Sequence, residues 1–147
     1  MIEYTIYTSN NPPTHTTKKT LIHFLYENLE NYGDPINDIE KCMDYSLSHD
    51  TSKGGMIISA EEDGAIIGCV VTNNTGMEDY IPENILVYIA THKNHRGKGV
   101  GKTLMHYVIK ETEGNIALHV EPDNPARFLY QKLGFTNKYL EMRLIKE

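Results

Sequence analysis

The sequence predicts a single α/β domain over residues 1–147, with a mixed, mostly antiparallel central sheet and helices on both of its faces. The length of 147 residues fits the ~100–200 residues that one domain usually contains. Apolar residues alternate in short segments and recur at helical spacing in longer ones. In chain order these segments indicate a strand, two helices, three strands, a helix, a strand, a helix and a final strand. That order favours a mixed sheet that helices cover on both sides.

Asn, Pro and Gly residues delimit the elements in the first half of the chain. The turn between two of the expected strands contains Gly64, which tolerates the positive φ of a tight hairpin. We expect a strand at 2–7, helices at 16–32 and 36–48, and strands at 55–61 and 65–72.

The second half of the chain carries clearer boundary signals. Asn124 followed by Pro125 predicts the start of a helix, because Asn caps free N–H groups and Pro fits the first helical position. Gly114 and Gly134 predict helix ends. The segment 85–91 is the most continuously apolar one, as expected for a strand covered on both faces. We expect strands at 85–91, 116–120 and 139–145, and helices at 99–113 and 125–133.

Composition and charge argue against several classes of protein. The chain has 14 Lys and Arg against 20 Asp and Glu, a net charge of −6, whereas nucleic-acid binding requires an excess of cations. Cys42 and Cys69 form no Cys-x-x-Cys pair, so we expect a reducing compartment and no disulfide framework. The chain opens without a secretory signal, and no apolar run approaches the ~20 residues of a membrane span. We therefore expect a cytoplasmic protein that binds neither nucleic acid nor membranes.

A glycine-rich turn between a strand and a helix is the strongest functional signal. Gly97, Gly99 and Gly101 alternate there, and glycine lets main-chain N–H groups approach an anion without interference from a Cβ atom. The start of the following helix adds partial positive charge. The segment 93–102 contains four cations and no acid. These features predict a phosphate-binding turn, and the alternative is a solvated glycine loop.

Spacing argues against two common phosphate-binding turns. A nucleotide-hydrolase P-loop, Gly-x-x-x-x-Gly-Lys-[Ser/Thr], would end at Gly101, Lys102 and Thr103, but Arg96 stands where its first glycine is required. The dinucleotide fingerprint Gly-x-Gly-x-x-Gly would need a glycine at Leu104. The remaining pattern is Arg-Gly-x-Gly-x-Gly.

That pattern resembles the pyrophosphate-binding turn of the GCN5-related N-acetyltransferases (GNAT). A second segment, 124–135, resembles the family's other signature, which combines Asn, Ala, Tyr and Gly-Phe in that order. The expected strand order agrees with the acyl-CoA N-acyltransferase fold over the whole chain. The resemblance implies transfer of an acetyl group from acetyl-CoA to a primary amine of a small molecule or peptide, by direct attack in a ternary complex without a metal. The alternative is a non-catalytic acyl-CoA-binding sensor; homodimers are common in the family.

The resemblance also implies how the coenzyme is held. The strand ending near Thr91 would splay from the strand at 116–120, which frees main-chain groups for the pantetheine arm and for an oxyanion. Asn124 would cap its helix, bind the coenzyme, or do both. The implied coenzyme contacts are Ile89, Ala90, Thr91, Arg96, Gly97, Lys98, Gly99, Val100, Gly101, Lys102 and Asn124.

Two residues are the implied catalytic groups. Tyr130, a phenol of ordinary pKa ~10, would protonate the leaving thiolate; the alternative is a buried tyrosine of an amphipathic helix. Glu83 lies at the interval before Arg96 at which histone-type relatives carry their base; the alternative is a solvated acid at a strand end. His92 and His95 flank the turn without acidic or cysteine partners, so no metal is expected. Acidic residues in the first two expected helices would attract a cationic amine, or would simply form a solvated face.

Overall fold

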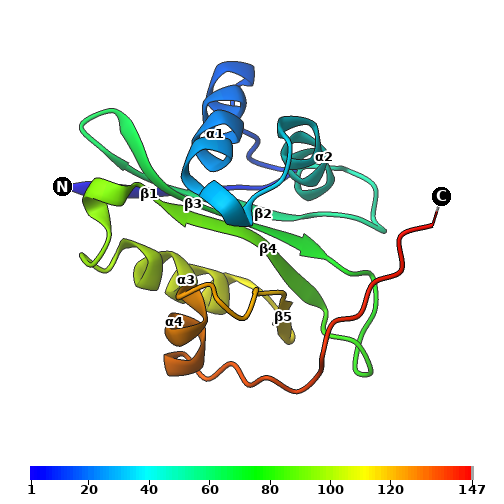
Figure 1. Ribbon diagram of the computed structural model, residues 1–147. Helices are drawn as coiled ribbons and strands as arrows, with labels where there is room; N and C mark the ends of the chain where they lie inside the picture. Colours follow the sequence, from blue (N-terminus) through cyan, green and yellow to red (C-terminus); the bar gives the residue numbers. More distant parts are fainter. Residues whose placement is uncertain (147) are drawn as a thin grey trace.

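The central sheet contains five strands in the order β1-β2-β3-β4-β5 (Figure 1). The structure is a computed structural model that describes residues 1–146. The first four strands pair antiparallel and β5 pairs parallel to β4, as the mixed sheet requires. The strands are β1 (Ile2–Tyr7), β2 (Gly55–Glu62), β3 (Ala65–Asn74), β4 (Asn84–Thr91) and β5 (Ile116–Leu118).

Helices cover both faces of this sheet, as the sequence predicts. Helices α1 (His15–Asn28) and α2 (Ile36–Ser46) pack on one face, and the short 3₁₀ helix η1 (Glu30–Tyr32) lies between them. On the opposite face lie α3 (Val100–Glu111) and α4 (Ala126–Lys132), as Figure 1 shows. Each face therefore has its own apolar core, and the sheet separates the two.

The turn between β2 and β3 forms as predicted. Glu62 pairs with Ala65, which leaves a two-residue loop of Asp63 and Gly64. Both residues have positive φ, 52° and 81°, as a type I′ turn requires. This turn pins the register of the sheet's central hairpin.

An irregularity in β4 decides where the sheet opens. Tyr88 pairs with Val71, but the next pair of the ladder joins Leu86 to Thr72, so Val87 is an extra residue. Leu86 consequently faces the core under α3, whereas Tyr88 faces the core under α1 and α2. The β4–β5 pairing ends at the same point, after three residue pairs. Between Val87 and Thr91, β4 therefore has no strand partner on its β5 side within residues 1–146.

The predicted strand at 139–145 is wrong. Residues 139–146 form no strand, and Tyr139, Leu140, Met142 and Leu144 are all at least 78% exposed. Figure 1 shows this segment running apart from β5 toward the C-terminus. Alternation alone cannot make a strand, because a strand also needs a neighbour whose N–H and C=O groups pair with its own. The strand expected at 116–120 is likewise shorter, ending at Leu118.

None of the helices formed by residues 1–146 is long and apolar enough to cross a membrane.

Candidate functional site

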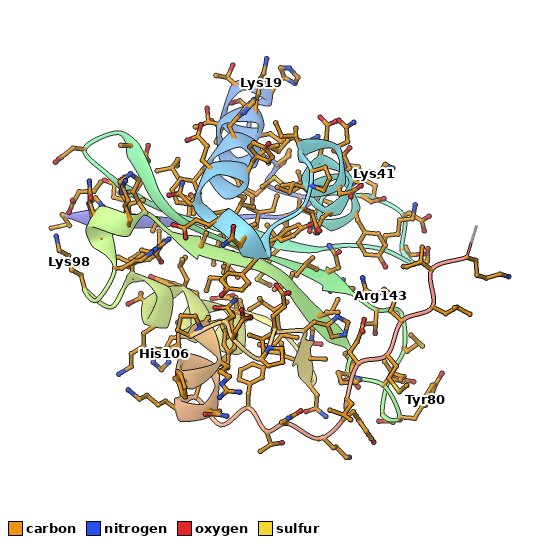
Figure 2. The ribbon with its side chains drawn as sticks, viewed as in Figure 1. Lys19, Lys41, Tyr80, Lys98, His106 and Arg143 are labelled. Carbon is orange, nitrogen blue, oxygen red and sulfur yellow. The ribbon has the colours of Figure 1, made fainter. Side chains whose placement is uncertain are left out.

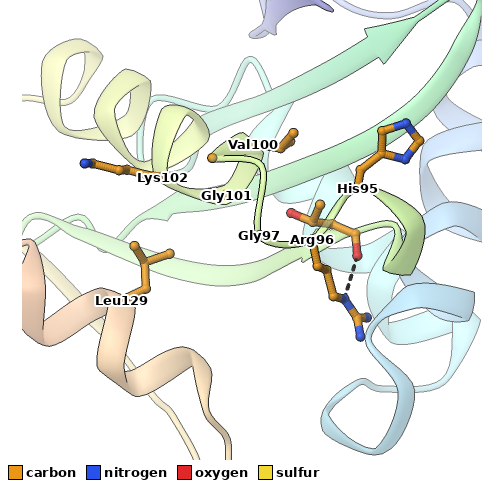
Figure 3. Close-up of a pocket in the computed structure, with 9 residues that line it drawn as sticks. His95, Arg96, Gly97, Val100, Gly101, Lys102 and Leu129 are labelled. Carbon is orange, nitrogen blue, oxygen red and sulfur yellow. Dashed lines mark hydrogen bonds between the residues drawn. The ribbon is translucent and has the colours of Figure 1, made fainter.

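A pocket of about 240 Å³ opens at the glycine-rich turn between β4 and α3 (Figure 3). The turn begins with the 3₁₀ helix η2 (Lys93–His95). The wall opposite the turn comes from Leu129 of α4, far along the chain. The lining residues are Thr91, His95, Arg96, Gly97, Gly99, Val100, Gly101, Lys102 and Leu129.

The glycines of the turn have conformations and surroundings that suit an anion. Gly97 and Gly99 have φ of +77° and +85°, and a Cβ atom on either would meet nothing within 4 Å. Their main chain thus borders open space that a larger side chain would partly fill. A Cβ atom on Gly101 would meet Thr91 Oγ1 at 3.6 Å and Leu129 Cδ2 at 3.7 Å, so this glycine lies against both walls.

The electrostatics of the turn favour negative charge. Helix α3 begins at Val100 directly after the turn and has no acidic residue in its first turn. Its free N–H groups and its dipole therefore present positive potential to the pocket. Lys98 and Lys102 are exposed, and neither forms an ion pair with another residue of the described chain. Figure 2 shows Lys98 projecting from the turn into solvent.

Arg96 lines the pocket, and its side chain also bonds to other parts of the chain. Its Nε donates to the Thr91 carbonyl oxygen at 3.2 Å, which Figure 3 shows. Its Nη2 donates to the Asn28 carbonyl oxygen at 3.4 Å and to Glu30 Oε1 at 3.3 Å. Arg96 therefore ties the glycine turn to the segment between α1 and α2.

The main chain of β4 offers hydrogen-bonding groups to a gap in the sheet, which lies on the β5 side of β4 between Val87 and Thr91, where β4 has no strand partner among the described residues. The His92 N–H donates to the Ile67 carbonyl oxygen at 2.8 Å, so these two residues form a hydrogen-bonded pair of the antiparallel ladder. Hydrogen-bonded and non-hydrogen-bonded pairs alternate along such a ladder, so the next pair, Thr91 and Gly68, has no mutual hydrogen bonds. Because the pattern alternates, the N–H and C=O groups of Thr91 and Ile89 point away from β3, toward the gap. Ala90, also a predicted coenzyme contact, differs from Ile89 and Thr91 because its main chain bonds to β3 and its methyl group is buried.

Tyr130 lies on α4 in the core beneath the sheet. It is 7% exposed and packs against Phe135, with ring centroids 5.9 Å apart. Burial raises the pKa of its hydroxyl to about 12. The hydroxyl makes no hydrogen bond to any of the residues that the structure describes. Nearby, Asn124 Oδ1 accepts from the Ala126 N–H at 2.9 Å, so Asn124 caps α4 as expected.

Glu83 is held in place by main-chain donors. Its Oε2 accepts from the Asp79 N–H at 3.0 Å, and its Oε1 accepts from the Asn115 N–H at 2.7 Å. These hydrogen bonds lower the pKa of the Glu83 carboxyl. Glu83 thereby ties the β3–β4 loop to the loop before β5, and both of its oxygens are occupied. Its role as a base remains a prediction, and these contacts favour a structural role.

Sequence reasoning missed the segment that crosses the gap. Tyr32 of η1 donates its hydroxyl to the Asp123 carbonyl oxygen at 3.4 Å, beyond β5. Two residues later, Asp34 Oδ2 accepts from the Tyr88 hydroxyl of β4 at 2.5 Å. The segment from Tyr32 to Asp34 therefore links β4 to the loop that follows β5. No motif marks it, because its partners lie 54 or more residues away.

Both histidines beside the turn have partners, and the prediction that His95 has no acidic partner is wrong. His95 Nε2 lies 3.3 Å from Glu62 Oε1, and His92 Nδ1 accepts from the Asn94 N–H at 3.1 Å. No group of three or more His, Cys, Asp or Glu in residues 1–146 is placed to hold a metal ion.

Comparison with known proteins agrees with this geometry. Residues 53–137 match the family described as "Acetyltransferase (GNAT) domain", which is more than half of the chain. The chain is a member of the GNAT acetyltransferase family, whose members use acetyl-CoA. The sequence matches no curated protein.

Solved structures share the fold at low identity. An aminoglycoside acetyltransferase from an uncultured soil metagenomic sample is 17% identical, with a TM-score of 0.70 over 100% of this chain and 99% of that one. An aminoglycoside N-acetyltransferase in complex with CoA is 20% identical, with a TM-score of 0.69 over 99% and 96%. A ribosomal-protein-alanine N-acetyltransferase from Brucella melitensis is 14% identical, with a TM-score of 0.65 over 99% of both chains.

Proposed function

We propose that this protein is an N-acetyltransferase that moves an acetyl group from acetyl-CoA to a primary amine by direct attack in a ternary complex. The observation that carries the proposal is the continuity of two features: the glycine-rich pocket at the start of α3, and the gap between β4 and β5 that begins beside it. The first suits a diphosphate and the second an extended amide-containing arm.

The turn supplies the binding energy for the phosphates. Main-chain N–H groups of Gly97, Gly99 and Gly101, together with Lys98 and Lys102, would bind the diphosphate. Between Leu86, where β5 pairing ends, and Thr91, β4 extends about 17 Å at ~3.3 Å per residue. Over that length the N–H and C=O groups of Ile89 and the N–H of Thr91 can bond an amide-bearing arm, since the Thr91 carbonyl oxygen already accepts from Arg96. An N–H in the gap can stabilise an oxyanion.

The cysteines support direct transfer rather than an acyl-enzyme. Cys42 and Cys69 are both buried, and burial raises the pKa of each thiol, to about 12 for Cys42. A thiol that stays protonated is a weak nucleophile, because the thiolate is the reactive form. The amine would therefore attack the thioester itself.

Tyr130 would protonate the departing thiolate. With a pKa of about 12 its hydroxyl keeps its proton throughout the neutral range and is present in the donor form, and it is a weaker acid than a free phenol. The hydroxyl makes no hydrogen bond to the described residues, so it remains available to a bound thioester. Leu129, its neighbour on α4, lines the pocket at the glycine-rich turn.

An acetylation assay on a panel of amines tests this function. Spermidine, kanamycin, free lysine and a peptide with an N-terminal alanine would each be incubated with acetyl-CoA, with products identified by mass spectrometry and thiol release measured in parallel. The structural neighbours include an aminoglycoside acetyltransferase and a ribosomal-protein-alanine N-acetyltransferase, which motivates two of these choices. One acetylated amine and a matching amount of free CoA supports the enzyme. Binding of CoA without any thiol release would instead identify a non-catalytic acyl-CoA sensor.

A further inference from the structure

Among the acids that the structure describes, only Asp34 has a carboxylate that accepts a hydrogen bond from a buried tyrosine. One of its oxygens, Oδ2, accepts from the hydroxyl of Tyr88, which is 6% exposed and belongs to the sheet core. Asp34 itself is exposed, and its other oxygen accepts no hydrogen bond from residues 1–146. A buried tyrosine thus fixes the orientation of a carboxylate whose free oxygen faces solvent.

The position of this pair relates it to the gap in the sheet. Tyr88 is the second residue of β4 beyond Leu86, where pairing with β5 ends. Its side chain belongs to the α1–α2 face, whereas the glycine turn and α3 belong to the opposite face. An arm lying in the gap from the α3 side would therefore end close to a carboxylate presented from the other side. The hydroxyl of Tyr32, bonded to the Asp123 carbonyl oxygen, ties the segment that carries Asp34 to the loop that follows β5.

Within the described chain, the titratable groups near Asp34 include no cation that would neutralise its carboxylate. The titratable groups that surround the Tyr88 hydroxyl are Asp34 together with Asp38 and Cys42 of α2. None is positively charged, and the ion pairs of the described chain all involve other acids. An ammonium group would therefore meet an unpaired carboxylate that is already held in one orientation.

We propose that Asp34 receives the ammonium group of the acceptor and takes its proton, and that Tyr88 is the positioning residue that orients Asp34. This inference rests on the proposed acetyl transfer and names its base. It also accounts for Glu83, whose two oxygens are already occupied by main-chain N–H groups.

The proton balance of the reaction is complete with these groups. Asp34 takes one proton from the ammonium and later passes it to solvent. The neutral nitrogen forms a bond to the thioester carbonyl carbon, and the carbon–sulfur bond breaks. Tyr130 donates a proton to the thiolate, and the proton lost by the acylated nitrogen reaches Tyr130 through solvent. The products are an amide, free CoA and one proton in solution.

Three variants test the assignment with the fastest amine of the panel. Asp34→Asn removes the base, and Tyr88→Phe removes only its orienting hydroxyl. Asp63→Asn is the matched control, because it makes the same charge change at an exposed aspartate of the β2–β3 turn, which is not among the groups around Tyr88. Isothermal titration with CoA verifies that each variant folds and binds the coenzyme as the wild type does.

At pH 7 we expect Asp34→Asn to lower kcat/KM for the amine by about 10²–10⁴-fold, the usual loss when a general base is removed. Tyr88→Phe should lower it by a smaller factor, and Asp63→Asn should leave it close to wild type. The deficit of Asp34→Asn should shrink as the pH rises toward ~10.4, where a lysine-like amine loses its proton unaided.

The outcomes separate the two levels of the proposal. If the wild type acetylates no amine, the proposed function fails and the assignment fails with it. If the wild type is active but Asp34→Asn behaves like Asp63→Asn, only the assignment is overturned. A deficit that stays constant with pH would also overturn it, because it would show that Asp34 binds the amine without taking its proton.

Discussion

Replacement of Gly97 by Ala isolates the part of the turn that would contact the coenzyme. Gly97 has φ +77°, and an alanine Cβ would meet no atom within 4 Å, so the fold itself has space for the methyl group. The cost to stability is then the left-handed conformation alone, about 1–2 kcal/mol for an L-residue. For a chain of this length that cost lowers Tm by about 2–8 °C.

Gly64 provides a matched control for this strain. It has φ +81°, it also has no atom within 4 Å of its ideal Cβ position, and it lies in the β2–β3 turn. Gly64→Ala should therefore lower Tm by a similar amount. Gly97→Ala alone should weaken CoA binding, because its methyl group obstructs a main-chain hydrogen bond to a charged phosphate worth about 1.5–3 kcal/mol.

That loss corresponds to roughly a ten- to hundredfold higher Kd for CoA. Isothermal titration of both variants, beside thermal unfolding of each, measures the two effects separately. Equal CoA affinities for Gly97→Ala and Gly64→Ala would refute the reasoning, since the coenzyme would then not approach the main chain at this turn.

Four further predictions concern single side chains. Tyr130→Phe should lower kcat while leaving CoA affinity unchanged; an unaltered kcat would remove Tyr130 from the mechanism. Glu83→Gln should lower Tm, because two main-chain N–H groups lose a charged acceptor; a pH-dependent fall in kcat/KM would instead restore Glu83 as the base. Glu30→Gln should tighten CoA binding by up to about fivefold at low salt, because it releases Arg96 for the phosphates; weaker binding would contradict this. Burial raises the pKa of the Cys42 thiol to about 12, so the folded state binds this proton more tightly than the unfolded state does. The free energy of unfolding should therefore fall as the pH rises from about 9 to 12. In Cys42→Ala, the denaturant midpoint should depend less on pH over that range.

Local signals in the sequence predict the elements whose structure is decided locally. The turn at Asp63 and Gly64, the Asn124 cap of α4 and the strand–turn–helix at Gly97 all follow from residue types within a few positions. The glycine-rich turn belongs to this group, since spacing alone separates its pattern from two others.

Features that depend on distant partners were not predictable in the same way. The extra residue Val87 in β4, which ends the pairing with β5, appears only when the registers of two ladders are known. The bond between Asp34 and Tyr88 joins residues 54 positions apart, and no local pattern indicates it. The residues at 139–145 alternate like a strand, yet they lack a paired neighbour.

The central claim is that the turn after β4 holds a diphosphate through its main-chain amides. Titration of uniformly ¹⁵N-labelled protein with CoA, followed residue by residue by NMR, tests it most directly. We expect the largest amide shifts at Gly97, Gly99 and Gly101, with further shifts at Ile89 and Thr91 along the gap. Shifts that are absent at these positions, or that cluster at another part of the surface when CoA is saturating, would contradict the account.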